Sequence, residues 1–221
     1  MSRGRTVKIQ LYEQFARIGK ALDSPQRLEL LDLLCQCERT VEDLAKEANL
    51  TIANTSRHLQ ILKASRMVES RKEGVKVYYR LSSLEVCDLV CDLRKLAEKT
   101  LAEVEQIMIH YFKGEESLKP VTREDLLKRV RQGNIVLLDV RPEIEYENAH
   151  LPLAKSIPLS QLQSRLTELP QNIEIVAYCR GPYCVLAQEA VDYLRRSGYN
   201  AWRLKEGVGE WREAGLEVID N

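Results

Sequence analysis

The stretch IANTSRHLQILKASRMVESRKEGVKVYYRL, residues 52–81, decides how the first half of the chain folds. Apolar residues recur at helical spacing from about residue 52 to 65, which predicts a helix with a polar outer side. Two strand-like runs at 68–72 and 76–81 flank a turn that contains Gly74, and they predict a hairpin. Such a helix fits the major groove of duplex DNA, and a basic hairpin contacts the phosphates beside it. The stretch therefore predicts a winged helix-turn-helix that binds DNA.

Helices are expected on both sides of this stretch. Before it, we predict helices at about 7–22, from Pro25 onward with Ser24 as the N-cap, and at about 41–48. After it, one long helix is expected at about 83–112, because apolar residues recur there every three or four positions. A helix of this length finds little to pack against in a small domain, which favours a dimer interface. Burial in the core of its own domain is the alternative.

Polar and basic side chains on the reading helix and the hairpin are the candidate DNA contacts. Seven Lys or Arg and two Glu lie between residues 54 and 80, a local charge of +5 (7 − 2), whereas the whole chain is neutral with 33 of each sign. This patch favours an anionic partner, and a solvated charged face is the alternative. A DNA contact is preferred to a metal at His58. The candidate DNA-binding residues are Asn54, Thr55, Ser56, Arg57, His58 and Gln60 on the helix and Arg71, Lys72 and Lys76 on the hairpin.

The same residues resemble those of a known family. The runs VEDLA at 41–45, SRHLQIL at 56–62 and GVKVYYRL at 74–81 resemble the ArsR/SmtB family of winged-helix repressors. The resemblance covers about residues 7–112. It implies a double-stranded DNA operator as the partner and a homodimer formed through the first and last helices. Thr40 and Glu42 stand where arsenite-sensing members have cysteines, and only His110 lies near the family's zinc site, so we expect no metal.

Cysteines are the second kind of candidate residue in the first half. The N-terminus lacks the apolar core of a signal peptide, and no apolar run is long enough to span a membrane. We therefore expect a cytoplasmic location, where cysteines are seldom structural staples. As candidate sensing thiols they could bind a soft metal or arsenite, or two could oxidise; burial as inert side chains is the alternative. These thiols are Cys35 and Cys37, which share a site only if their helix ends before Cys37, and Cys87 and Cys91, which share a helix face.

After a polar segment at 113–120, strand-like and helical runs alternate. Helices are expected at about 123–131, 161–168 and 185–197, with strands at 135–139, 173–178 and 201–204. This alternation predicts a central parallel sheet with crossover helices. We accordingly divide the chain into a mainly α winged-helix domain for DNA binding and dimerisation at 1–112, a linker at 113–120 and an α/β domain at 121–221.

The loop CRGPYC, residues 179–184, is the candidate site of the second half. Cys179 follows a buried strand, at the sheet edge where open α/β folds bind ligands. Inward-turned backbone N–H groups and the next helix dipole would favour a thiolate, so we expect a lowered pKa at Cys179, with Arg180 adding positive charge. Cys184 could link to Cys179 through two or three sulfurs, as in a redox or sulfur sensor. A small residue at the helix start is the alternative for Cys184.

This half resembles the rhodanese family over about residues 118–221, through DVR at 139–141, HLP at 150–152, the Cys179 loop and the segment from Gly207 to Trp211. The resemblance implies that Cys179 is a nucleophile that takes sulfane sulfur from a small donor and passes it to a thiol or cyanide, without a cofactor. It also implies that Asp139 and Arg141 are framework residues that support the loop. Cys184 departs from the basic residue that is usual in the family. Val185 stands where phosphatases of this fold carry Arg, which disfavours phosphatase activity.

Three functions follow from these observations. The first is a repressor whose rhodanese-like domain senses or transfers sulfane sulfur through Cys179, as a persulfide or a Cys179–Cys184 link. The second is a sulfurtransferase that the first domain tethers to DNA. The third is an arsenite or soft-metal repressor that uses the four thiols of the first domain.

Overall fold

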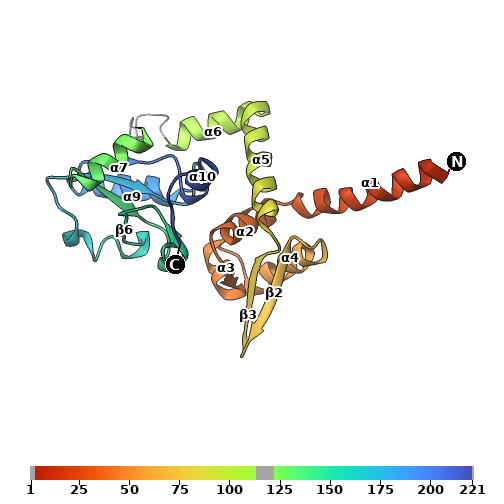
Figure 1. The fold of residues 1–221 in the computed structure, drawn as a ribbon. Coiled ribbons are helices and arrows are strands. Elements are labelled where there is room, and N and C mark those ends of the chain that lie inside the picture. The colour runs from red at the N-terminus through yellow and green to blue at the C-terminus, as the bar shows by residue number, and fades with distance from the viewer. Residues whose placement is uncertain (1–2, 113–121, 221) are drawn as a thin grey trace. The chain divides into compact units, whose positions relative to one another are not determined.

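The computed structural model describes residues 3–112 and 122–220 of the chain. The chain divides into two compact units, 1–100 and 101–221, and each is described by itself below (Figure 1). The predicted linker at 113–120 lies outside the described residues.

The first unit is a winged helix-turn-helix, as predicted. Its helices are α1 (Arg3–Leu22), α2 (Pro25–Gln36), α3 (Val41–Glu47), α4 (Ile52–Ala64) and α5 (Leu84–Thr100), and its strands are β1 (Arg39–Thr40), β2 (Val68–Glu73) and β3 (Lys76–Leu81). Side-chain caps begin three of the helices: the hydroxyls of Ser24, Thr40 and Thr51 accept backbone N–H bonds at the starts of α2, α3 and α4. The strands pair antiparallel in the order β1-β3-β2, and the long β2–β3 hairpin forms the wing (Figure 1).

The single helix predicted at 83–112 is wrong, because the chain breaks at Leu101 into α5 and α6 (Ala102–Phe112). No Pro or Gly lies near the break. The hydroxyl of Thr100 donates to the carbonyl oxygen of Leu96, a bond that competes with the regular helix ladder. The division into units falls at this break, so that α6 belongs to the second unit.

The second unit is a parallel sheet with helices on both faces, as predicted. Its strands are β4 (Ile135–Asp139), β6 (Lys155–Ser156), β7 (Glu174–Tyr178) and β8 (Ala201–Arg203), in the order β6-β4-β7-β8. The helices are α6, α7 (Arg123–Arg131), α8 (Glu143–Asn148), α9 (Leu186–Arg196) and α10 (Val208–Glu213), and β5 (Ala149–His150) pairs with β9 (Ile219–Asp220). The helix predicted at 161–168 is instead two 3-10 turns, η2 (Leu159–Gln161) and η3 (Leu166–Glu168).

Two apolar layers enclose this sheet and fix the position of the loop after β7. Side chains of α9 pack on one face, together with Ile175 and Ala177 of β7 and with Cys179. Leu126 of α7 and Trp211 of α10 pack on the other face. Because successive strand residues point to opposite faces, Cys179 falls in the layer that α9 covers. Within the described residues, no helix is long and apolar enough to cross a membrane.

Candidate functional sites

The loop between β7 and α9 holds Cys179 and Cys184 beneath the start of α9. Gly181 has φ of 144°, a backbone conformation that essentially only glycine adopts. Gly207, just before α10, approaches the loop so closely that an added Cβ would lie 2.5 Å from the carbonyl oxygen of Cys179. The two glycines therefore allow a tight loop that is held against α10.

Cys179 and Cys184 are both free thiols, and they interact. Cys179 is 2% exposed, and its Sγ donates to the carbonyl oxygen of Cys184 at 3.3 Å. Burial, followed by the contact with Cys184, raises the pKa of Cys179 well above its usual value. The lowered pKa predicted for Cys179 is therefore wrong: backbone N–H groups at Ala187 and Gly181 favour the thiolate, but burial outweighs them.

The lowered pKa belongs instead to Cys184. The side-chain interaction with Cys179 is the main cause, and the charge of Arg180 adds to it, while burial opposes both. Cys184 is also the more exposed residue of the pair. A first negative charge on the pair therefore resides on Cys184.

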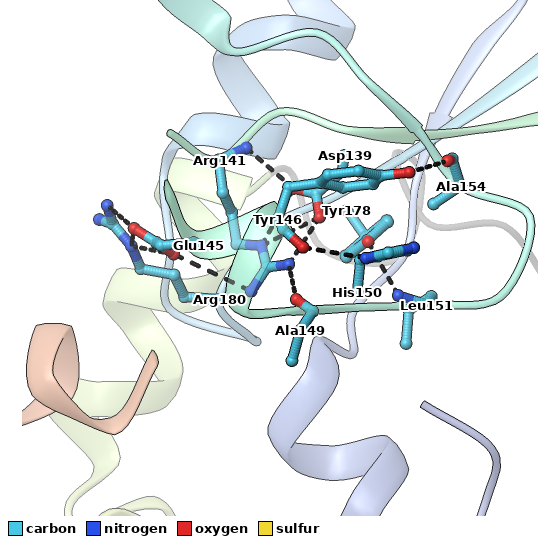
Figure 2. Close-up of polar contacts among 10 residues, drawn as sticks. All are labelled: Asp139, Arg141, Glu145, Tyr146, Ala149, His150, Leu151, Ala154, Tyr178 and Arg180. Atoms are coloured by element: carbon cyan, nitrogen blue, oxygen red, sulfur yellow. Dashed lines mark hydrogen bonds and ion pairs between the residues drawn. The ribbon is translucent and has the colours of Figure 1, made fainter. Parts of the chain in front are cut away.

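A buried network of charges connects the sheet to this loop (Figure 2). The Asp139 carboxylate accepts from the backbone N–H of Arg141 at 3.0 Å and from its guanidinium at 2.6–3.2 Å. That guanidinium also donates to the carbonyl oxygen of Ala149 at 2.8 Å and lies 3.9 Å from the Glu145 carboxylate. Glu145 in turn binds the Arg180 guanidinium at 2.6 Å. Arg180 was expected to add positive charge at the loop. It is instead paired with a buried carboxylate, and this ion pair anchors the loop to α8.

Arg203, a residue that the sequence did not single out, also faces this loop. It ends β8 and is 1% exposed, and its guanidinium donates to the carbonyl oxygen of Pro182 at 3.3 Å. Strand alternation contained the signal, since Arg203 shares a face of β8 with the buried Ala201. A cation from β8 therefore stands near the pair, although Cys184 replaces the basic residue usual at its own position.

In the first unit, α4 presents most of the candidate DNA contacts to solvent. Asn54, Arg57 and Gln60 are exposed, and Ser56 and His58 are partly exposed. The prediction that Thr55 contacts DNA is wrong, because Thr55 is fully buried and its hydroxyl donates to the carbonyl oxygen of Thr51. It lies four and seven residues before Leu59 and Leu62, so it belongs to their inward face. Burial lowers the pKa of His58, and the charges of Arg27 and Arg57 lower it further, which favours a neutral imidazole.

The wing exposes Arg71, Lys72 and Lys76, but Arg71 is not an uncompensated cation. Its guanidinium binds Glu38 at 2.6–3.0 Å and Glu73 at 2.5 Å. These hydrogen bonds raise the pKa of Arg71. The sequence count of charge at 54–80 missed Glu38, because that residue lies outside the range.

The candidate sensing thiols of the first unit are divided in the structure. Cys35 of α2 and Cys87 of α5 form a disulfide across 52 residues of sequence. This agrees with the alternative that two of these thiols oxidise, although cross-links were expected to be uncommon here. Cys37 lies just after the last residue of α2 and is buried, and Cys91 is partly exposed. Among the residues described, no three His, Cys, Asp or Glu side chains are grouped so as to hold a metal ion. The described geometry therefore favours a thiol pair over a four-thiol metal cluster.

Comparisons with known proteins divide the chain in the same way. The family described as "Rhodanese-like domain" matches residues 122–214, and "Bacterial regulatory protein, arsR family" matches residues 24–70. The HTH-type transcriptional regulator Rv0324 of Mycobacterium tuberculosis is 42% identical over 96% of this chain and 92% of its own. A sulfurtransferase of Allochromatium vinosum is 28% identical over 45% of this chain and 92% of its own. A solution structure of the homodimeric winged helix-turn-helix DNA-binding domain of Mb0332 from Mycobacterium bovis is 40% identical, covers 42% of this chain and 87% of that domain, and has a TM-score of 0.41.

Proposed function

The chain belongs to the ArsR family of HTH-type transcriptional regulators and carries a rhodanese-like domain, and from this premise we propose that it is a repressor whose binding to DNA is controlled by sulfane sulfur at Cys179 and Cys184. The observation that carries this proposal is that the two cysteines meet in one loop: the Cys179 thiol donates to the carbonyl oxygen of Cys184 at 3.3 Å, and the two side chains shift each other's pKa. Such a pair can first accept a sulfur atom and then close on itself.

The sulfur chemistry requires a small donor, for which a hydrodisulfide anion, HSS⁻, serves as the example. As Cys184 takes the proton of Cys179, the Cys179 sulfur attacks the outer sulfur of the donor. A new S–S bond forms, the donor's S–S bond breaks, and hydrosulfide leaves with the electron pair. The Cys184 thiol then displaces hydrogen sulfide from the Cys179 persulfide and leaves a Cys179–Cys184 disulfide. Overall, two thiols lose two electrons, and the sulfane sulfur is reduced to sulfide.

DNA binding is assigned to α4 and the wing of the first unit. In this proposal α4 enters the major groove with Asn54, Arg57 and Gln60, and Lys72 and Lys76 contact phosphates. Apolar side chains are exposed along α1 (Val7, Leu11, Phe15) and α5 (Leu89, Leu93, Leu96). Exposed apolar rows of this kind support a homodimer through these helices. A regulator of this kind acts where the DNA lies, which supports a location in the cytoplasm.

The test is a mobility shift of the full chain on duplex DNA from upstream of its own coding sequence. Hydropolysulfide should release the DNA, and peptide mass spectrometry should find added sulfur on Cys179 or a Cys179–Cys184 link. If DNA is released while both loop cysteines stay unmodified, the proposed site is wrong. Rapid thiosulfate:cyanide turnover with unchanged DNA binding would make the chain an enzyme that is held on DNA.

A second candidate is a thiol response in the first unit, favoured by the Cys35–Cys87 disulfide. This bond joins α2 to α5, so its opening would alter the support of a helix that presents apolar side chains to a partner. Release of DNA by dithiothreitol, which reduces this disulfide, or by arsenite added to the reduced chain, would favour this candidate if it survives Cys179→Ser and is lost in Cys35→Ser. Release of DNA that is lost in Cys179→Ser and unchanged in Cys35→Ser would exclude it.

A further inference from the structure

A buried cation with no carboxylate partner lies beside the cysteine loop. Arg203 is 1% exposed, and its guanidinium donates to the carbonyl oxygen of Pro182. Its Nε has no hydrogen-bond partner, and among residues 3–112 and 122–220 no carboxylate pairs with it. An unpaired buried charge destabilises the folded state. A neighbouring group that becomes negatively charged would offset this cost.

The other side of this guanidinium is covered by an aromatic ring. Phe112, the last residue of α6, is buried, and the Arg203 guanidinium lies 4.4 Å from the centre of its ring. A cation over a ring face is attracted to it, but the ring carries no negative charge to neutralise the cation. Phe112 also keeps water away, and the field of Arg203 therefore reaches the neighbouring loop with little screening.

The cysteine pair is the group that can supply the missing negative charge. Burial lowers the pKa of Arg203, and negative charge on either Cys179 or Cys184 raises it. The same interaction acts in the other direction, since a nearby cation favours a thiolate over a thiol. A Cys–S–S⁻ terminus bears the same charge on a longer group, and the Pro182 contact holds the guanidinium against the loop that would carry it.

The other charged groups around the pair are already engaged. Arg180 is bound to Glu145 of α8. Glu210 of α10 accepts from the backbone N–H of Gly207 at 2.8 Å and lies beside Gly181. Gln188 of α9 faces the interior as a neutral amide that donates to Asp192.

We propose that Arg203 is the counter-ion of this site and binds the anionic sulfur of Cys179 or Cys184, including the terminal sulfur of a persulfide and the anionic donor that delivers it. The part that concerns the persulfide rests on the proposed function. The part that concerns the resting thiols stands without it. In this proposal Arg203 of β8 supplies the positive charge that the loop lacks at residue 184.

The test compares Arg203→Met with Arg203→Lys in the full chain. Iodoacetamide alkylation of the 179–184 peptide is followed by mass spectrometry as a function of pH, without any sulfur donor. Loss of the cation should raise the apparent pKa of the pair and so lower the alkylation rate at neutral pH about tenfold. Arg203→Lys should retain most of the wild-type profile, because it keeps the charge.

Two controls separate this effect from structural damage. Arg195→Met removes another arginine that contacts β8, whose guanidinium donates to Ala201 and lies over Trp202, and it should leave the alkylation profile unchanged. Arg203→Met should also keep or raise the unfolding temperature of the reduced chain, because it replaces an unpaired buried charge with an apolar side chain. Persulfide lifetime after hydropolysulfide treatment is compared in the same variants, and Arg203→Lys should stay closer to the wild type than Arg203→Met does. If Arg203→Met fails to fold, Arg203→Gln replaces it as the neutral variant in both measurements.

The outcomes distinguish this inference from the proposed function. Coincident alkylation profiles for wild type and Arg203→Met, or a persulfide that Arg203→Lys shortens as much as Arg203→Met does, would overturn the role of Arg203. A wild-type loop that hydropolysulfide leaves unmodified would overturn the proposed function, while the alkylation profiles would still decide whether Arg203 stabilises the thiolate.

Discussion

The two units of this chain place their charged side chains in opposite environments. In the first unit Arg71 pairs with Glu38 while half of its side chain stays exposed, so water and salt screen the pair. In the second unit the side chains of Asp139 and Arg141 are 0% and 1% exposed. A screened surface charge can exchange a carboxylate for a phosphate, whereas a buried charge controls the protonation of its neighbours. The contrast suits the first unit to reversible DNA contacts and the second to thiol chemistry.

Their cysteine pairs differ in the same sense. Cys35 and Cys87 come from α2 and α5 and form a cross-link between elements distant in the sequence. Cys179 and Cys184 lie in one loop, are not linked to each other, and interact with the charges of Arg180 and Arg203. The first pair links two helices covalently, whereas the protonation of the second pair depends on the charges beside it.

The largest expected effect separates the two pairs by chemistry. Cys179→Ser should abolish sulfur addition on the 179–184 peptide after hydropolysulfide treatment, because the acceptor sulfur is gone. Cys35→Ser is the matched variant and should leave that addition unchanged. Peptide mass spectrometry measures both. Equal loss in the two variants would mean that the pairs do not act separately.

The next largest effect tests whether breaking a buried ion pair costs more stability than breaking an exposed one. Asp139→Asn leaves the Arg141 guanidinium buried without its main partner, and breaking a buried pair in this way costs about 3–5 kcal/mol. The urea midpoint of the second unit, followed through the buried Trp211, should fall accordingly. Glu38→Gln removes a surface partner of Arg71 and should leave the midpoint of the first unit nearly unchanged. Similar shifts in both variants would contradict the contrast between the units.

A smaller effect is expected from opening the Cys35–Cys87 disulfide. A cross-link over a loop of this size stabilises a fold by about 2–4 kcal/mol, chiefly by restricting the unfolded chain. Dithiothreitol or Cys87→Ser should therefore lower the thermal midpoint of the first unit and spare that of the second. Cys91→Ser keeps the disulfide and is the control. A second unit that loses as much stability as the first would show that the bond supports more than its own unit.

The sequence predicted those elements whose ends carry local signals. Ser24 and Pro25 begin α2 as expected, and the hairpin of β2 and β3 follows from its alternation and turn. The break at Leu101 carries no Pro or Gly, so the apolar spacing continued through it. Thr55 was misplaced although its spacing from Leu59 and Leu62 already indicated the buried face.

The candidate sites were harder to predict, because their properties depend on contacts between distant segments. The Cys179 loop was recognised from its position after a strand, but the sign of its pKa shift depends on how deeply α9 and the sheet bury it, and burial prevails. Strand alternation puts Arg203 on the buried face of β8, but nothing in the sequence indicates that Arg203 of β8 or Glu145 of α8 contacts a residue of the loop. The Cys35–Cys87 pairing likewise joins residues 52 apart, where four cysteines permit several pairings.

The smallest expected effect concerns the surface charge itself. Glu38→Gln removes one of the two carboxylates that bind Arg71 and leaves Glu73 as the other, so its guanidinium becomes more available to a DNA phosphate. Binding to operator DNA should then tighten a few-fold at low salt. One more phosphate contact should also steepen the fall of log K with log salt by about 0.9. Lys72→Gln, which removes an exposed wing cation, should change both quantities in the opposite direction. Because Glu73 still binds Arg71 in this variant, the double variant Glu38→Gln/Glu73→Gln is measured beside it. A salt slope that both variants leave unaltered would mean that Arg71 does not reach the phosphates, and the wing would then contact DNA through its lysines.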